Sequence, residues 1–136
     1  LIDTVHECAA IDNLLTTYKD ESSLFMLYEK AIVSDLSTLV HDITMTPSIC
    51  QHVVACVANG ISALHKAGVL YRAVAADMLF VDNNGLVVLH DFRFSKFDVE
   101  GYTMCGIPEY MSPEQVSQQG HGPAADWWAV GILMYE

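Results

Sequence analysis

Residues 69–92 constrain the fold of this chain more than any other stretch. Two apolar runs at 79–82 and 86–89 flank the turn sequence Asn83-Asn84-Gly85. Asn and Gly tolerate the positive φ angles that tight hairpin turns require, so the pattern predicts a short β-hairpin. The residues His90-Asp91-Phe92 follow it directly. In any fold of this chain, the residues just before and just after this compact hairpin must therefore lie at its two ends.

Two apolar runs near the beginning predict a second hairpin. Residues 11–19 are apolar with paired threonines, which is typical of a strand. Residues 24–28 are continuously apolar, which predicts a strand buried on both faces. The polar residues 20–23 between them supply turn chemistry. We expect an antiparallel pair here, and we interpret residues 1–10 as the tail of a helix.

Capping residues and apolar spacing predict three further helices. Ser34 is a candidate cap for a helix that extends through Val40. Thr46-Pro47-Ser48 begins a long helix that Gly68 ends, and Gly60 predicts a closely packed neighbour at its middle. A third helix, residues 127–135, has Asp126 as its expected N-cap.

The predicted elements are segregated along the chain. Two strands come first, then helices, a hairpin, a long loop over residues 91–122 and a buried helix. Segregation of this kind predicts an α+β fold. A Rossmann fold is not expected, because strands and helices do not alternate.

Composition restricts the class of partner. The chain has 136 residues, 52% of them apolar and 17% charged, which is typical of a globular domain. The net charge of −11 argues against nucleic acid and anionic membrane surfaces as partners. An acidic surface fits a basic peptide or protein, and the alternative is an acidic face that is merely solvated.

Cysteine usage and the chain ends add two expectations. The four cysteines lack C-x-x-C spacing and do not cluster with histidines, so we expect reduced thiols in a cytoplasmic or nuclear protein. No continuous apolar run reaches transmembrane length. The chain begins at Leu1 and stops at Glu136 inside a helical pattern, so we expect a piece of a longer protein.

Five motifs follow one another in the order and spacing of a known family. They are Tyr71-Arg72, Asp91-Phe92, Cys105-Gly106-Ile107-Pro108-Glu109-Tyr110, Ser112-Pro113-Glu114 and Asp126-Trp127-Trp128-Ala129-Val130-Gly131. Together the motifs resemble the eukaryotic protein kinases. The first, third and last are most similar to the cyclic-nucleotide-dependent serine/threonine kinases of the AGC group.

The resemblance implies a partial kinase-like domain. Residues 1–29 would be the end of the small lobe, and residues 30–136 the large lobe through its central helix. The glycine-rich loop, the phosphate-anchoring lysine and its glutamate partner would lie before Leu1. Glu7 falls too late to be that glutamate.

Several positions that carry chemistry in the family hold other residues here. By the resemblance, the catalytic carboxylate falls at Ala73, the lysine at Ala75 and the metal-binding asparagine at Met78. A positioned base contributes roughly 10²–10⁴-fold, and a thioether is a poor ligand for Mg²⁺. Asp77 is not expected to replace Met78, because its side chain should point elsewhere. The family threonine that contacts the base and the lysine falls at Ile107.

The nucleotide and metal positions are partly retained. Asp91 matches the metal aspartate, but the following family glycine is replaced by Arg93, which would bind a phosphate or occupy the magnesium position itself. Asp35 matches an acidic residue that touches ribose or a basic substrate, or it is a solvated helix-start carboxylate. The resemblance frames the adenine site with Tyr28, Glu29, Ala31 and Phe80.

Switch and scaffold positions match the family better. Thr103 matches the phosphate acceptor of the activation loop, with Arg72 and Lys96 as its basic partners. Glu114 would pair with an arginine beyond Glu136, and Asp126 would accept backbone bonds near Tyr71. The six histidines are scattered along the chain, and we expect His65, His90 and His121 to be surface or loop residues.

The resemblance leaves three functions open. The first is a pseudokinase, a regulatory or binding module of a longer chain beside other domains, such as cyclic-nucleotide-binding ones. The second is a serine/threonine kinase of weak or atypical activity that uses ATP and Mg²⁺. The third is a structural remnant without a ligand.

Overall fold

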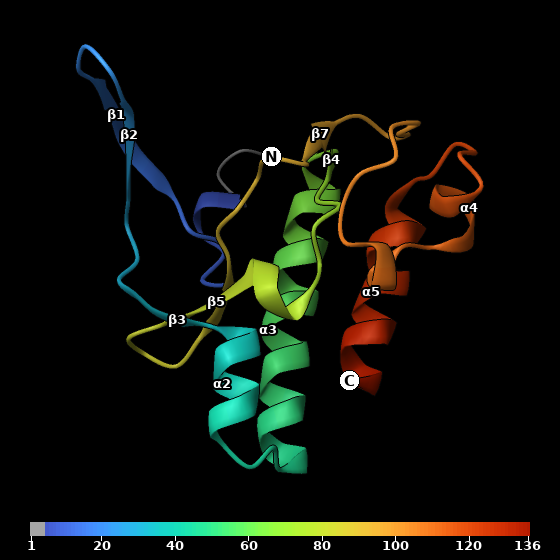
Figure 1. Cartoon of the computed structure of the whole chain (residues 1–136), viewed down its shortest axis with the longest axis horizontal. Coiled ribbons are helices and arrows are strands. Elements are labelled where there is room, and N and C mark those ends of the chain that lie inside the picture. Colours follow the sequence, from blue (N-terminus) through green and yellow to red (C-terminus); the bar gives the residue numbers. More distant parts are fainter. Residues whose placement is uncertain (1–4) are drawn as a thin grey trace.

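The computed structural model describes residues 5–136 and has the predicted α+β architecture (Figure 1). Its strands form three small antiparallel groups, β1–β2, β3–β5–β6 and β4–β7. In chain order the elements are β1 (Leu14–Lys19), β2 (Leu24–Tyr28), β3 (Ile32–Asp35), α2 (Leu36–Asp42), α3 (Pro47–Lys66), β4 (Val69–Leu70), the 3₁₀ turn η1 (Ala76–Met78), β5 (Leu79–Asp82), β6 (Val87–Leu89), β7 (Lys96–Phe97), the 3₁₀ turn η2 (Pro108–Tyr110), α4 (Pro113–Val116) and α5 (Pro123–Tyr135).

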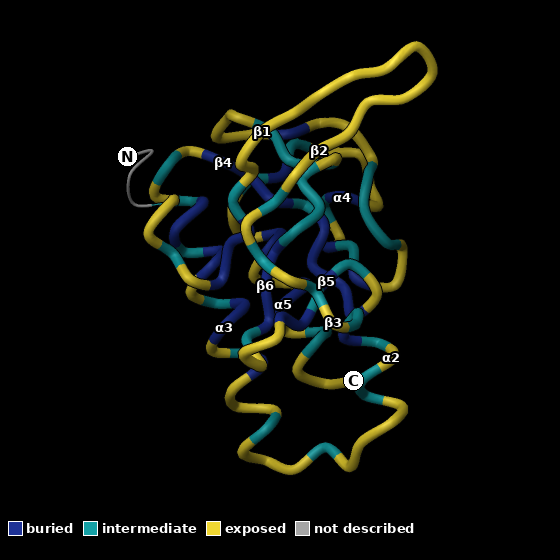
Figure 2. Tube along the Cα trace, turned by 90° about the vertical axis from the view of Figure 1, so that its left-hand side faces the viewer, coloured by how far each residue is buried: buried dark blue, intermediate teal, exposed yellow. Residues whose placement is uncertain are grey.

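Helix α3 is the centre of the core. The Thr46 hydroxyl accepts the Ile49 N–H at 3.3 Å, and Gly68, at a φ of +75°, follows the helix end as predicted. Its buried face contacts β4, β6 and α5, and the buried residues gather around it (Figure 2). At Gly60 a side chain would collide with Leu89 of β6, which explains the glycine inside the helix.

Helix α3 is also long and apolar enough to cross a membrane, although no continuous apolar run of that length was expected. Seven of its residues are buried, among them Val57 and Ile61 with no exposed area. Each buried side chain of this size contributes about 1.5–3 kcal/mol. That burial is typical of a core helix.

The predicted hairpin of residues 79–89 is present. Strands β5 and β6 pair, Gly85 has a φ of +81°, and the Asp82 carboxylate accepts the N–H groups of Asn84 and Leu86 at 2.8 and 2.9 Å. These bonds lower the pKa of Asp82 against the opposing effect of burial, which is the largest single influence on it. The turn is therefore closed by its own side chain as well as by its glycine.

The pair β1–β2 has the predicted antiparallel register, but the predicted burial of β2 is wrong. Leu24 is 63% exposed and Met26 54% exposed. The turn end of the pair projects away from the rest of the molecule, which leaves these side chains exposed (Figures 1 and 2). A continuous apolar run therefore does not by itself establish burial.

The predicted cap of α2 is also wrong. Asp35 caps the helix, and its carboxylate accepts the Thr38 N–H at 2.7 Å and the Thr38 hydroxyl at 2.8 Å. The Thr38 N–H is the main cause of the lowered pKa of Asp35. Ser34 is not available as a cap because β3 pairs with β5 as far as Asp35.

Other boundaries differ from prediction for local reasons. Helix α5 begins at Pro123, after an N-cap at Gly122, so Asp126 lies inside the first turn. The stretch 91–122 is not all loop, since it contains β7, η2 and α4. The helix tail predicted for residues 1–10 lies in part outside the described residues, and Val5 and His6 are helical.

Candidate functional site

The loop between β4 and β5 is buried and apolar where the family places its catalytic side chains. Ala73 is 2% exposed and Ala75 has no exposed area. Met78 and Ile107 pack against the same core. Asp77 is exposed on η1. The four substituted positions are therefore continuous with the hydrophobic core.

The Asp126 side chain binds the backbone at the beginning of this loop. Its carboxylate accepts the Tyr71 N–H at 3.0 Å and the Arg72 N–H at 2.7 Å, the contact predicted from the sequence. Arg72 has a φ of +61°, in the left-handed region that costs most residues about 1–3 kcal/mol. The Arg72 Nε–H also donates to the Phe94 carbonyl at 2.7 Å. These bonds fix a strained backbone at the beginning of the loop.

His65 completes this cluster, although it was predicted to lie on the surface or in a loop. Its Nε2 lies 2.7 Å from the Asp126 carboxylate, and its side chain is 12% exposed. Asp126 itself is 2% exposed. His65 lies in the last turn of α3, and nothing in the sequence spacing indicates that it meets a residue 61 positions later.

Some buried polar atoms near the loop have no partner among the described residues. They are the Tyr71 hydroxyl, one terminal Arg72 nitrogen and both ring nitrogens of His121. Ala73 and Ala75 have no polar side-chain atoms, so the buried atoms without a partner belong to other residues. Burial raises the pKa of Tyr71 and lowers that of His121, because it disfavours the charged form of each. His121 was predicted to be a surface or loop residue; it lies in the connection between α4 and α5 and is 2% exposed.

The predicted metal aspartate is already paired with a cation. The Asp91 Oδ2 lies 2.5 Å from a terminal nitrogen of Arg93, and Oδ1 accepts the Arg93 N–H at 3.0 Å. The bond to Asp91 raises the pKa of Arg93. In the part of the chain that the structure describes, no three His, Cys, Asp or Glu side chains gather as a metal site. Asp91 is therefore paired with a cation, and Met78 offers only a thioether, which is a poor ligand for Mg²⁺.

Two of the residues predicted to frame the adenine site, Tyr28 and Phe80, contact a third ring, His90. The His90 ring lies 4.4 Å from the Tyr28 ring and 5.2 Å from the Phe80 ring, between centroids. His90 was assigned to the surface or a loop, and its side chain is 27% exposed. The backbone of the two remaining framing residues is engaged, since the Glu29 N–H donates to Asn13 and the Ala31 carbonyl accepts from Asn83.

The structure does not bring the predicted phosphate ligands to Thr103. Thr103 is exposed, whereas the Lys96 ammonium bonds to the Glu100 carbonyl at 2.9 Å and pairs with Asp98 at 2.8 Å. Arg72 is held by Phe94 as described above. Glu114 is half-buried in α4 and has no ion-pair partner in residues 5–136. The phosphate site and the Glu114 pair stay predictions.

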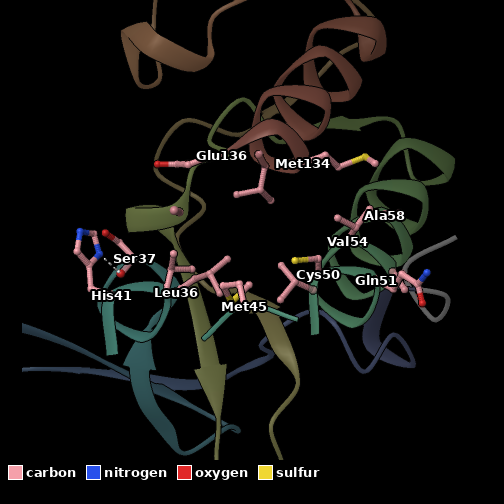
Figure 3. A pocket seen from close by; sticks show the side chains of 15 residues that line it. Leu36, Ser37, His41, Met45, Cys50, Gln51, Val54, Ala58, Met134 and Glu136 are labelled. Carbon is pink, nitrogen blue, oxygen red and sulfur yellow. Dashed lines mark hydrogen bonds between the residues drawn. The ribbon is translucent and has the colours of Figure 1, made fainter. Parts of the chain in front are cut away.

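An apolar cavity of about 400 Å³ lies elsewhere, between α2, α3 and the end of α5 (Figure 3). Of the loop residues, Ala76 alone contributes to its lining. Leu36, Met45 and Val54 are among the residues that point toward it. This cavity is separate from the positions that the resemblance assigns to nucleotide and metal.

Known proteins match the chain over most or all of its length. The protein kinase domain model matches residues 1–136. A cAMP-dependent protein kinase catalytic subunit from Dictyostelium discoideum is 33% identical over all of the chain and 21% of its own length. Two cGMP-dependent protein kinases are each 35% identical to the chain. Isozyme 2 forms cD5/T2 of Drosophila melanogaster matches over 95% of the chain and 14% of its own length. The cGMP-dependent protein kinase 2 of Homo sapiens matches over 93% of the chain and 17% of its own length. The chain thus spans about a fifth or less of these relatives.

Proposed function

This chain belongs to the protein kinase domain family and is related to the cyclic-nucleotide-dependent kinases, and from that premise we propose that it is a pseudokinase. It acts as a regulatory or binding module and does not transfer phosphate. The observation that carries the proposal is the ion pair of Asp91 with Arg93, because it neutralises the single retained metal ligand. Homology alone makes the use of ATP and Mg²⁺ plausible.

The apolar loop supports the same proposal. Phosphoryl transfer depends on positioning and on stabilisation of charge, supplied by a carboxylate, a lysine and metal ligands. Ala73 and Ala75 are buried and provide neither a base nor a cation. A single missing base removes about 10²–10⁴-fold of rate, and here the losses coincide. Asp91 serves instead to order residues 91–95, through the Arg93 N–H and side chain.

The partner in this proposal is a protein. The net charge of −11 favours a basic peptide or protein, or other domains of a longer chain, in the cytoplasm or the nucleus. Neither nucleic acid nor a membrane is part of the proposal.

A second candidate is a serine/threonine kinase of weak activity, and the retention of Asp91 is the observation in its favour. Such an enzyme would need Arg93 to leave the carboxylate before a metal could bind there. A structural remnant without any ligand is the third candidate.

Thermal unfolding with ATP, with and without Mg²⁺, tests the proposal on the intact protein. We expect any shift of the melting temperature to be the same with and without the metal, because Arg93 already neutralises Asp91. Asp98→Asn is the matched control, since Asp98 is another carboxylate paired with a cation in the same region. A stabilisation that requires Mg²⁺ and is lost in Asp91→Asn, but not in Asp98→Asn, would contradict the proposal.

A further inference from the structure

Three aromatic rings meet where the family would place a nucleotide base. Tyr28 ends strand β2, Phe80 lies on β5, and His90 directly follows β6. The His90 ring contacts both others, with tilted or edge-on geometry. Centroid separations of 4.5–7 Å are typical of favourable aromatic pairs, so these rings are in close contact.

Asp12 fixes the position of His90. The Asp12 carboxylate is 2% exposed, and its Oδ2 lies 2.8 Å from the His90 Nδ1. Its Oδ1 accepts the Lys30 N–H at 3.0 Å, and its own N–H donates to the Leu89 carbonyl at 3.0 Å. A buried carboxylate with several bonds holds its partners firmly, because loss of any bond leaves a charge in an apolar surrounding.

The His90 ring packs against both Tyr28 and Phe80, where it would compete with any other ring. A planar base that stacked against Phe80 would need the space that the imidazole takes, and the imidazole cannot turn away without breaking its bond to Asp12. The same cluster also links the segment after β2 to the hairpin β5–β6, through Asp12 and its bond to Lys30. The protein's own side chains thus contact one another at the position that the resemblance assigns to the base.

We propose that His90, anchored by Asp12, fills the base-recognition space and excludes adenine. The inference rests on the proposed function, since it concerns the same kinase-like site, but it is separate from phosphoryl transfer. Asp12 and His90 are positioning residues in this account. Neither carries a family role in the sequence motifs, and Asp12 lies 78 positions before its partner.

Calorimetric titration with adenosine tests the inference, because adenosine has a base but no phosphate and needs no metal. For the intact wild-type protein we expect no binding at millimolar concentration. His90→Thr combined with Phe80→Leu removes two of the three rings. We expect this double variant to bind adenosine with an affinity at least about tenfold higher than the weakest that the titration detects. Tyr18→Leu is the matched control, since it breaks the exposed Tyr18–Phe25 stack at a centroid distance of 4.7 Å and should create no binding.

Two further variants keep the test decisive if the double variant does not fold. Asp12→Asn retains the size of the side chain but weakens the anchor, and Phe80→Leu alone keeps His90 in place. We expect weak adenosine binding in Asp12→Asn and less in Phe80→Leu, in samples whose circular dichroism matches wild type.

Adenosine binding by the wild type, unchanged in these variants, would overturn the inference. Absence of binding in every folded variant would overturn it as well, since the rings would then not be what excludes the base. Either result leaves the proposed lack of phosphoryl transfer standing, which is measured separately with ATP and a protein substrate.

Discussion

Two parts of the loop between β4 and β5 differ in polarity. At its beginning, the Asp126 carboxylate accepts two backbone N–H groups and contacts His65 at hydrogen-bonding distance. Further along the loop, Ala73 and Ala75 are apolar and buried. The chain has kept the polar contacts that shape the loop and has lost the polar groups that would act on a substrate.

This difference separates what the fold requires from what catalysis requires. A buried donor without a partner costs about 1–3 kcal/mol, so the Asp126 cluster contributes to stability in every molecule of this shape. A catalytic aspartate or lysine contributes to rate and is itself costly to bury. Without selection for rate, alanine and isoleucine at these positions are the more stable choice.

The largest effect is expected from Asp126→Ala. The change leaves the N–H groups of Tyr71 and Arg72 without an acceptor and His65 without its partner. We expect the free energy of unfolding to fall by roughly 4 kcal/mol, measured by urea denaturation. Asp77→Ala, at an exposed position on η1, is the control and should change little. Equal effects of the two variants would mean that the cluster does not hold the loop.

The next effect tests the apolar side. Ala73→Asp places a carboxylate at a position that is 2% exposed. We expect a loss of roughly 2–3 kcal/mol in the free energy of unfolding, partly recovered when Ala75→Lys is added. A double-mutant cycle by urea denaturation measures the recovery. A neutral single variant would show that polar groups are still accommodated there.

A smaller effect is expected at the metal position. Arg93→Gly frees the Asp91 carboxylate from its ion pair. We expect Mg²⁺ binding to appear in the millimolar range, because one carboxylate holds this ion weakly. Calorimetric titration of wild type and variant measures it, with Lys96→Gly as the control, since that lysine pairs with Asp98 instead. Comparable Mg²⁺ binding by wild type would contradict the role of Arg93.

The smallest effect concerns alkaline pH. Burial and the bond to Glu136 raise the pKa of Tyr110 to about 12, and burial raises that of Tyr71 further. A raised pKa stabilises the fold fully below the ordinary tyrosine value of about 10, and this contribution is lost as the pH rises toward the folded value. We expect the free energy of unfolding to fall above about pH 10. Urea denaturation at several pH values measures this decrease. Tyr71→Phe should reduce this dependence, and an unchanged profile would argue against the burial of its hydroxyl.

Short-range patterns predicted most of the scaffold. The turn at Gly85, the cap at Thr46 and the end of α3 at Gly68 each depend on a few adjacent residues, and the structure has all three. The burial of β2 could not be predicted in this way, because it depends on what lies against the strand. The helix cap at Asp35 was missed since strand pairing of β3 extends through that residue.

Long-range side-chain contacts of the candidate site were beyond reach of the sequence. The pairs His65–Asp126 and Asp12–His90 join residues 61 and 78 positions apart, without a motif that connects them. The substitutions at Ala73 and Met78 were visible because the family motif fixes their place. The sequence left open whether Arg93 binds a phosphate or occupies the magnesium position, because it does not show where a long side chain points; in the structure Arg93 pairs with Asp91.

The most direct test of the central claim is transfer of the γ-phosphate of ATP by the intact protein, to itself and to a basic peptide, with Mg²⁺ present. Wild type and Asp91→Asn are measured side by side in the same assay. The account predicts no transfer above background by either protein. Transfer by wild type that is abolished in Asp91→Asn would show that the retained aspartate still binds a catalytic metal, and the claim that the loop serves only as a scaffold would be wrong.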